Sequence, residues 1–135
     1  MRGFETFIVG RGYEMRIERF ALFQSIYEPG SDQHLDIARG RVLFDEYFAG
    51  EVEHMELTPG AAAALKAFSQ VAGVIILTNA PPQGRDPRTR WLIRNGLDFP
   101  LVINSGPKGA CVAAIAAKTR GAVAFIDDLM PNLDS

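Results

Sequence analysis

The sequence has a single cysteine, Cys111, among its 135 residues. A disulfide within the chain is therefore excluded. Proteins without disulfides are typical of reducing compartments, so we expect a cytoplasmic protein. Cys111 lies in an apolar run over residues 109–117, where a thiol is expected to pack as a small hydrophobic side chain rather than to act as a nucleophile.

Positive charge and long hydrophobic runs are also scarce. The 14 Lys and Arg residues are outnumbered by 16 Asp and Glu, and the formal net charge of -2 provides no broad basic surface for nucleic acid. No apolar run approaches the roughly 18 to 20 residues of a membrane-spanning helix, and residues 1–5 lack the hydrophobic segment of a signal peptide. We therefore expect neither nucleic acid nor a membrane as a partner.

The composition changes near residue 58. All three tyrosines and six of the nine phenylalanines precede this point, whereas Ala, Val, Ile and Gly dominate the rest of the chain. Apolar residues recur at helical spacing over residues 4–8 and again over residues 44–55. This pattern predicts a helical, cap-like region over residues 1–57.

Residues 58–135 alternate helical segments with short apolar runs. Thr58 followed by Pro59 predicts the start of a helix that ends at Gly73. The predicted strands are residues 74–77, 101–103 and 122–126, and the helices between them are residues 86–94 and 107–119. The alternation predicts the α/β class, with a doubly wound parallel sheet that forms an incomplete Rossmann-like core.

Polar side chains follow each predicted strand. They are Thr78 and Asn79 after the first, Asn104, Ser105 and Lys108 after the second, and Asp127 and Asp128 after the third. Ligands of open α/β sheets bind outside the carboxyl ends of the strands, so we expect these side chains to converge on one ligand. A hydroxyl, an amide, an ammonium and two carboxylates together suit a metal-bound phosphate.

The adjacent Asp127 and Asp128 indicate a divalent metal. Two like charges this close are unfavourable unless a cation lies beside them, and magnesium prefers such oxygen ligands. A solvated turn capped by Asp127 is the alternative. Lys108 is expected in the first turn of a helix, where the helix dipole disfavours a cation by roughly 0.3 to 1 kcal/mol, and a bound anion would reverse this effect.

Other charged and ligand-type residues are assigned no site. The arginines in the predicted helix at residues 86–94 and just before it are expected to form a solvated face rather than a substrate clamp. These residues are Arg85, Arg88, Arg90 and Arg94. His34 and His54 have no Cys or His partner at the spacing of metal ligands.

The order of the polar residues resembles motifs II, III and IV of the haloacid dehalogenase (HAD) superfamily, whose members are mostly phosphatases and related hydrolases. The motifs read Ile-Leu-Thr78-Asn79-Ala, Gly-Pro-Lys108-Gly and Phe-Ile-Asp127-Asp128 in this sequence. The resemblance covers residues 58–135. A response-regulator receiver is excluded, because it places the acidic pair before the threonine and the lysine.

The resemblance implies a magnesium-dependent phosphatase that acts on a small phosphorylated molecule. Thr78 and Asn79 would bind the phosphate group. Lys108 would neutralise it and orient the nucleophile, and Asp127 and Asp128 would hold Mg²⁺. These roles agree with the needs of phosphoryl transfer, which depends on charge neutralisation and in-line positioning.

The nucleophile motif of the family, Asp-x-Asp, occurs nowhere in the sequence. One interpretation takes Asp45 as the nucleophile, although the surrounding residues also fit an amphipathic helix. The other places the motif upstream of Met1, with residues 1–57 as the cap between motifs I and II. Without that central strand the sheet would have two open apolar edges, so we expect an unstable chain or a homodimer.

Four functions are considered. The first is phosphoester hydrolysis through an aspartyl-phosphate, with weak or no activity expected for this chain if the nucleophile lies upstream of Met1. The second is a catalytically silent HAD-like module for phosphate binding or assembly. A purely structural domain is a third alternative, and a dehalogenase that uses Asp45 and Tyr47 is a fourth.

Overall fold

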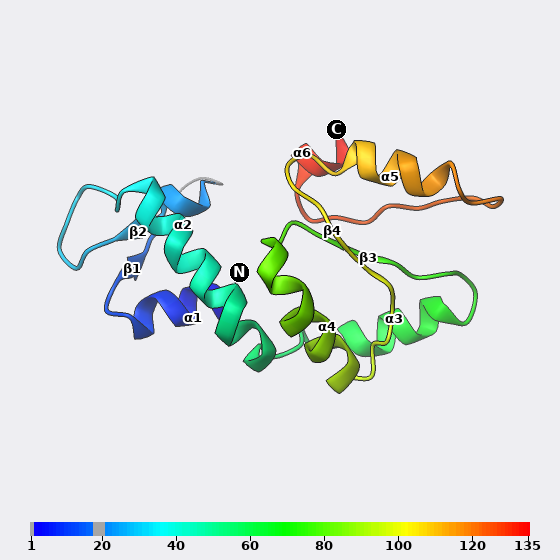
Figure 1. Ribbon diagram of the computed structural model, residues 1–135, viewed down its shortest axis with the longest axis horizontal. Coiled ribbons are helices and arrows are strands. Elements are labelled where there is room, and N and C mark those ends of the chain that lie inside the picture. Colours follow the sequence, from blue (N-terminus) through cyan, green and yellow to red (C-terminus); the bar gives the residue numbers. More distant parts are fainter. Residues whose placement is uncertain (1, 18–20) are drawn as a thin grey trace.

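The computed structural model describes residues 2–17 and 21–135, which form two connected halves (Figure 1). The elements in chain order are α1 (Arg2–Gly10), β1 (Glu14–Met15), η1 (Leu22–Gln24), β2 (Ile26–Tyr27), α2 (Ile37–Glu46), η2 (Tyr47–Glu51), η3 (Val52–His54), α3 (Ala61–Ser69), β3 (Ile76–Thr78), η4 (Pro82–Gly84), α4 (Arg85–Arg94), β4 (Leu101–Ile103), α5 (Gly109–Ala116) and α6 (Met130–Leu133). Within the described ranges, every helix is too short or too polar to cross a membrane.

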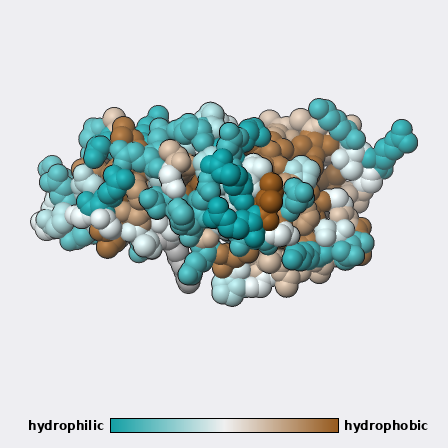
Figure 2. All heavy atoms as spheres, turned by 60° about the horizontal axis from the view of Figure 1, so that its bottom comes forward, coloured by the Kyte–Doolittle hydropathy of each residue, from teal (hydrophilic) through white to brown (hydrophobic). Residues whose placement is uncertain are grey.

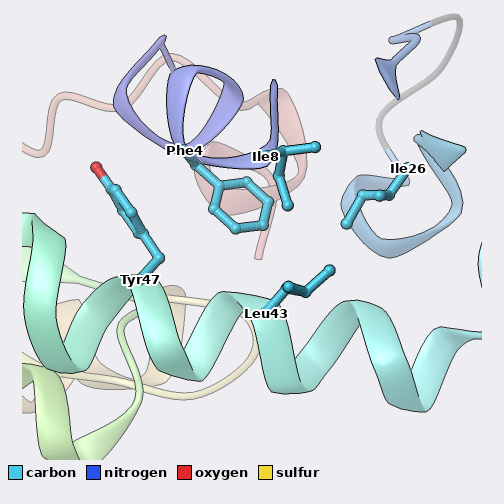
Figure 3. Packing of buried hydrophobic residues seen from close by; sticks show 5 residues of the cluster. All are labelled: Phe4, Ile8, Ile26, Leu43 and Tyr47. Carbon is cyan, nitrogen blue, oxygen red and sulfur yellow. The ribbon is translucent and has the colours of Figure 1, made fainter. Parts of the chain in front are cut away.

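α1 and α2 pack against each other and build the core of the N-terminal half. Asp36 caps α2, because its Oδ1 accepts hydrogen bonds from the N–H groups of Ala38 and Arg39 at 2.8 and 3.4 Å. The side chains between the two helices are apolar and nearly all hidden from water (Figure 3). The buried cluster consists of Phe4, Ile8, Ile26, Leu43 and Tyr47. α1 confirms the helix predicted around residues 4–8.

The chain after α2 departs from the regular helix predicted over residues 44–55. It continues as a π-helical turn in η2 and a 3-10 turn in η3 before it becomes extended at Met55. Val52 is fully buried within these turns. The segment therefore remains helical, but with a changing pitch.

The C-terminal half contains one parallel pair of strands. Ile76, Leu77 and Thr78 of β3 lie opposite Leu101, Val102 and Ile103 of β4. α4 connects the two strands, so this part of the chain is a β-α-β unit. The unit confirms two of the predicted strands and their parallel pairing, although β3 begins two residues later than predicted. The larger doubly wound sheet stays a prediction, since β3 and β4 form a two-stranded sheet in the described part of the chain.

The third predicted strand, residues 122–126, belongs to neither sheet of the described residues. Val123 and Ile126 are 45% and 78% exposed, so the apolar side chains that suggested a buried strand face solvent. A strand needs a neighbouring edge for its N–H and C=O groups, and β3 has a paired edge only on the side of β4. Figure 2 shows hydrophobic surface over the half of the molecule that holds α3 and the parallel strands.

The start of α3 also differs from the prediction. Thr58 does not cap the helix through its side chain; its carbonyl oxygen instead accepts a hydrogen bond from the N–H of Ala61 at 3.0 Å. Gly60 occupies the N-cap position with a φ of 83°, a left-handed conformation that glycine adopts without steric cost. The Thr58-Pro59-Gly60 sequence is therefore a turn before the helix.

α4 joins the two halves of the molecule. The indole Nε1 of Trp91 donates a hydrogen bond of 2.6 Å to the carbonyl oxygen of Met55, and Met55 packs against the hydrophobic clusters of both halves. Gly84, just before α4, lies so close to η2 that a Cβ atom there would come within 2.8 Å of the Phe48 ring. Glu53 receives hydrogen bonds from Arg90 Nε at 2.6 Å and Arg94 Nη2 at 3.1 Å. The two halves are thus fixed to each other by apolar and polar contacts.

Candidate functional site

The carboxyl ends of β3 and β4 are joined by amide hydrogen bonds. Asn104 Nδ2 donates to Asn79 Oδ1 at 2.8 Å, and Asn79 Nδ2 donates to the carbonyl oxygen of Gly106 at 2.9 Å. The N–H of Asn104 donates to the carbonyl oxygen of Thr78 at 2.9 Å. Because parallel strands end at the same edge of a sheet, two loops that are distant in sequence come together here. The bonds hold the loop that leads to Lys108 against the end of β3.

Lys108 and Asp127 form an ion pair beside this loop. The Nζ atom of Lys108 donates a hydrogen bond of 2.6 Å to Oδ2 of Asp127, and the two side chains are only 12% and 5% exposed. Oδ1 of Asp127 accepts hydrogen bonds from the N–H of Leu129 and from Nδ2 of Asn132, both at 2.9 Å. The structure therefore brings two of the predicted site residues into direct contact.

These contacts lower the pKa of Asp127. Burial, the largest single influence, raises the pKa, but it is outweighed by the hydrogen bonds from Asn132, Lys108 and Leu129 and by the positive charge of Lys108. The net effect is a pKa of about 2. Asp127 is therefore ionised at neutral pH and is a structural partner of Lys108.

Asp128 lies in different surroundings from its neighbour. Its side chain is exposed and lines a cleft between the two halves, whereas Asp127 is turned toward Lys108. Among the described residues, no group of three or more His, Cys, Asp or Glu side chains is arranged to hold a metal ion. Asp128 has a carboxylate open to Mg²⁺, but both oxygens of Asp127 are occupied by hydrogen-bond donors. The predicted two-carboxylate arrangement thus does not fit the ion as these side chains lie.

Asp45 is on the exposed side of α2, in a helix rather than at the end of a strand. Leu43 of α2 and Tyr47, the first residue of η2, face the core instead. Over residues 2–17 and 21–135, no hydrogen bond or ion pair joins Asp45 to Lys108 or to the end of β3. Asp45 as a nucleophile stays a hypothesis without a supporting contact.

Arg88 is the residue whose surroundings differ most from the expected exposed arginine face. Its Nε atom is buried, and its guanidinium carbon lies 4.3 Å from the centre of the Trp91 ring. Arg90 and Arg94 extend to Glu53 instead. The spacing of three residues between Arg88 and Trp91 on one helix is a signal that could have indicated this stacking from the sequence.

The site thus consists of a hydrogen-bonded polar cluster at the ends of β3 and β4 and a larger cleft whose lining includes Asp128. Lys108, Asp127 and Asn79 belong to the first part, with Thr78 beside them at the end of β3. Comparison with protein-family models, with curated proteins and with solved structures gave no match to this chain.

Proposed function

We propose that this chain is a HAD-like hydrolase that cleaves the phosphate ester of a small phosphorylated molecule. The observation that supports the proposal is the contact between Lys108 and Asp127 beside a loop that Asn79 ties to the end of β3. This contact gathers residues from three separate segments at the edge where ligands of α/β sheets bind. Their order along the chain is the order that resembles the family.

In the proposed reaction, a phosphate monoester and water give an alcohol and inorganic phosphate. The ester P–O bond breaks, the leaving oxygen takes up a proton to become the alcohol, and the water oxygen ends on phosphorus. Lys108 supplies positive charge next to the phosphate oxygens, and the hydroxyl of Thr78 donates a hydrogen bond to one of them. Asn79 holds the loop before Lys108 in place through its amide. Asp127 keeps the lysine side chain oriented. Charge neutralisation of this kind is the main need of a phosphoryl-transfer transition state.

The test is turnover of p-nitrophenyl phosphate with and without added magnesium. Lys108→Met should lower kcat at least about tenfold, because a charged donor to the phosphate is lost. Lys118→Met, which removes an exposed lysine near the end of α5, is the matched control and should keep the wild-type rate. Equal rates for the two variants would contradict the proposed role of Lys108.

The second candidate is a catalytically silent module that binds phosphate without cleaving it. The position of Asp45 on the exposed side of a helix favours this alternative, because no described contact brings that carboxylate to the phosphate site. Calorimetry with inorganic phosphate separates the two functions. Binding that is weakened by Lys108→Met, without any turnover, supports the silent module. Absence of both binding and turnover contradicts both candidates.

A further inference from the structure

A cleft of about 1410 Å³ lies between the two halves of the molecule. Its walls come from α1, from the turns η2 and η3, from α3 and from α4, and Asp128 lies at its edge. This volume is above the roughly 300 to 1,000 Å³ of common small-molecule sites, so an organic ligand of ordinary size fits. Aromatic and aliphatic side chains line much of it, including Phe7, Leu57 and Trp91.

Tyr47 contributes a buried hydroxyl group to this cleft. The residue is 3% exposed, and its Oη atom has no hydrogen-bond partner in the described part of the chain. Burial raises the pKa of the phenol, which keeps the hydroxyl protonated as a donor. Figure 3 shows the ring beside Phe4, with the hydroxyl directed away from Leu43. The apolar part of Tyr47 is thus in the core, and its polar end reaches the cleft wall.

Arg88 contributes a second unpaired donor. Its Nε atom is buried without an acceptor, and no acidic side chain of the described residues forms an ion pair with it. Burial lowers the pKa of the guanidinium, while Tyr47 acts in the opposite direction. Both residues line the same cleft. Nearby Arg11 differs, because its Nη1 donates to Glu46 at 2.7 Å. Buried donors normally have partners, so Tyr47 Oη and Arg88 Nε are two donors that the acceptor oxygens of a ligand could satisfy.

We propose that this cleft binds a small organic anion with an apolar or aromatic body. Its oxyanion, a carboxylate or a phosphate group, accepts hydrogen bonds from Arg88 and from the Tyr47 hydroxyl, and its body packs against Phe7 and Trp91. A singly charged group fits best, because Glu51, Glu56 and Asp128 also line the cleft and would repel a ligand of high negative charge.

Binding requires a small movement of the lining side chains. The Tyr47 oxygen and Arg88 Nε are both closed off from water in the structure. Met55 lies beside Gly3, where a Cβ atom would be 2.4 Å from Tyr47 Oη and 3.0 Å from Met55 Cγ. An unbranched methionine changes its conformation easily, so Met55 is the side chain most suited to open the site. The site uses neither Thr78 nor Lys108 and is independent of the proposed function.

The only tryptophan of the chain, Trp91, lies in the cleft and provides the measurement. Intrinsic fluorescence is titrated with benzoate, with phenyl phosphate and with neutral benzyl alcohol, in EDTA so that no metal-dependent reaction occurs. We expect a saturable change with one or both anions, and a weaker or absent response to benzyl alcohol. The relative affinities of benzoate and phenyl phosphate distinguish a carboxylate ligand from a phosphate ligand.

Variants of the two donors, with one control, test the site. Arg88→Gln should weaken anion binding at least about tenfold, and Tyr47→Phe about three- to tenfold, as expected for loss of a charged and a neutral hydrogen bond. Arg120→Gln, which changes an exposed arginine outside the cleft lining, should bind like the wild type. Circular dichroism confirms folding. If Arg88→Gln does not fold, Arg88→Lys and Tyr47→Phe are used to test the proposal instead. Both should bind the anions more weakly than the wild type does.

The absence of a saturable response to either anion would overturn the proposal. Equal affinities in the wild type and in the folded donor variants, or equal affinity for benzyl alcohol and the anions, would also overturn it. Lys108 is not among the residues that line the cleft, so Lys108→Met that is folded by circular dichroism should bind the anions like the wild type even where hydrolysis is lost. The failure of one proposal is therefore distinguishable from the failure of the other.

Discussion

The ammonium of Lys108 lies 2.6 Å from Oδ2 of Asp127, nineteen residues away in sequence, with both side chains almost fully withdrawn from water. Each charge needs the other, because an unpaired charge in such surroundings is strongly unfavourable. The pair connects the start of α5 to residues that follow the unpaired segment 122–126. The ion pair therefore helps to hold the segment after residues 122–126 in place, as hydrogen bonds between strands do in a sheet.

Lys108→Met should lower the free energy of unfolding by about 3 kcal/mol, because it leaves Asp127 buried without its cation. The measurement is urea unfolding followed by circular dichroism. Lys118→Met is the control, since Lys118 is exposed, and should change the stability by less than about 0.5 kcal/mol. Similar losses in the two variants would show that the ion pair contributes nothing specific.

The low pKa of Asp127 predicts a particular acid dependence of stability. The carboxyl pKa is about 2 in the folded chain, below its ordinary value of 3.8. The stabilisation is therefore complete above the unfolded pKa and is lost as the pH falls from about 4 to about 2. Asp127→Asn should be less stable at neutral pH and should lose less stability over this interval. Urea unfolding at several pH values measures the free energy of unfolding of the wild type and of the variant.

Asp45→Asn is the control for this experiment, because it removes an exposed carboxylate from α2. It should retain the pH dependence of the wild type. A carboxyl carbon resonance of Asp127 that titrates near pH 4 in the folded protein would contradict the assignment of the hydrogen bonds.

Gly84→Ala should weaken the junction between the two halves. The new Cβ atom would lie 2.8 Å from Cδ1 and 3.2 Å from Cβ of Phe48, so the ring and the start of α4 must move apart. Overpacking of this kind costs about 1–3 kcal/mol. Thermal unfolding measures the loss. Gly73→Ala is the matched control, because nothing lies within 4 Å of a Cβ atom there and it should unfold like the wild type.

The unpaired edge of β3 predicts self-association. Ile75, just before the strand, is 44% exposed, and apolar strand edges of this kind pair with other chains. Ile75→Lys should reduce the apparent molecular mass at high protein concentration in sedimentation experiments, because a charged side chain opposes edge pairing. Val71→Lys, at a position 84% exposed after α3, should leave the association unchanged. A wild-type chain that remains monomeric at all concentrations would refute the prediction.

Local patterns along the chain were sufficient for most of the helices and for β3 and β4. The β-branched run before Thr78 and the apolar run over residues 101–103 both became strands, and they pair in parallel as their connection by α4 requires. Residues 122–126 have the same kind of composition but pair with no strand in the described part of the chain. The composition of a segment indicates that it can form a buried strand. Whether a neighbouring strand is available to pair with it depends on the whole fold.

In the candidate site, too, some features could be predicted from the sequence and others depend on the tertiary structure. Lys108 and Asp127 were predicted to converge on one ligand, Lys108 at a phosphate and Asp127 at a magnesium ion, and in the structure the two side chains contact each other directly. Asp128 was predicted to share a metal with Asp127, but adjacent side chains can face opposite surroundings, and Asp128 lies at the cleft. Arg88 was expected among exposed arginines, but the packing of α4 against η2 and η3 leaves it partly buried, with its Nε atom withdrawn from water.

The sequence by itself determined the order of the chemical groups along the chain and the change from an aromatic to an aliphatic half, because both depend only on neighbouring residues. The tertiary structure decided which groups are withdrawn from water and which face each other. Lys108 is paired with Asp127, whereas Tyr47 Oη and Arg88 Nε have no hydrogen-bond partner among residues 2–17 and 21–135, since pairing depends on distances between segments far apart in sequence.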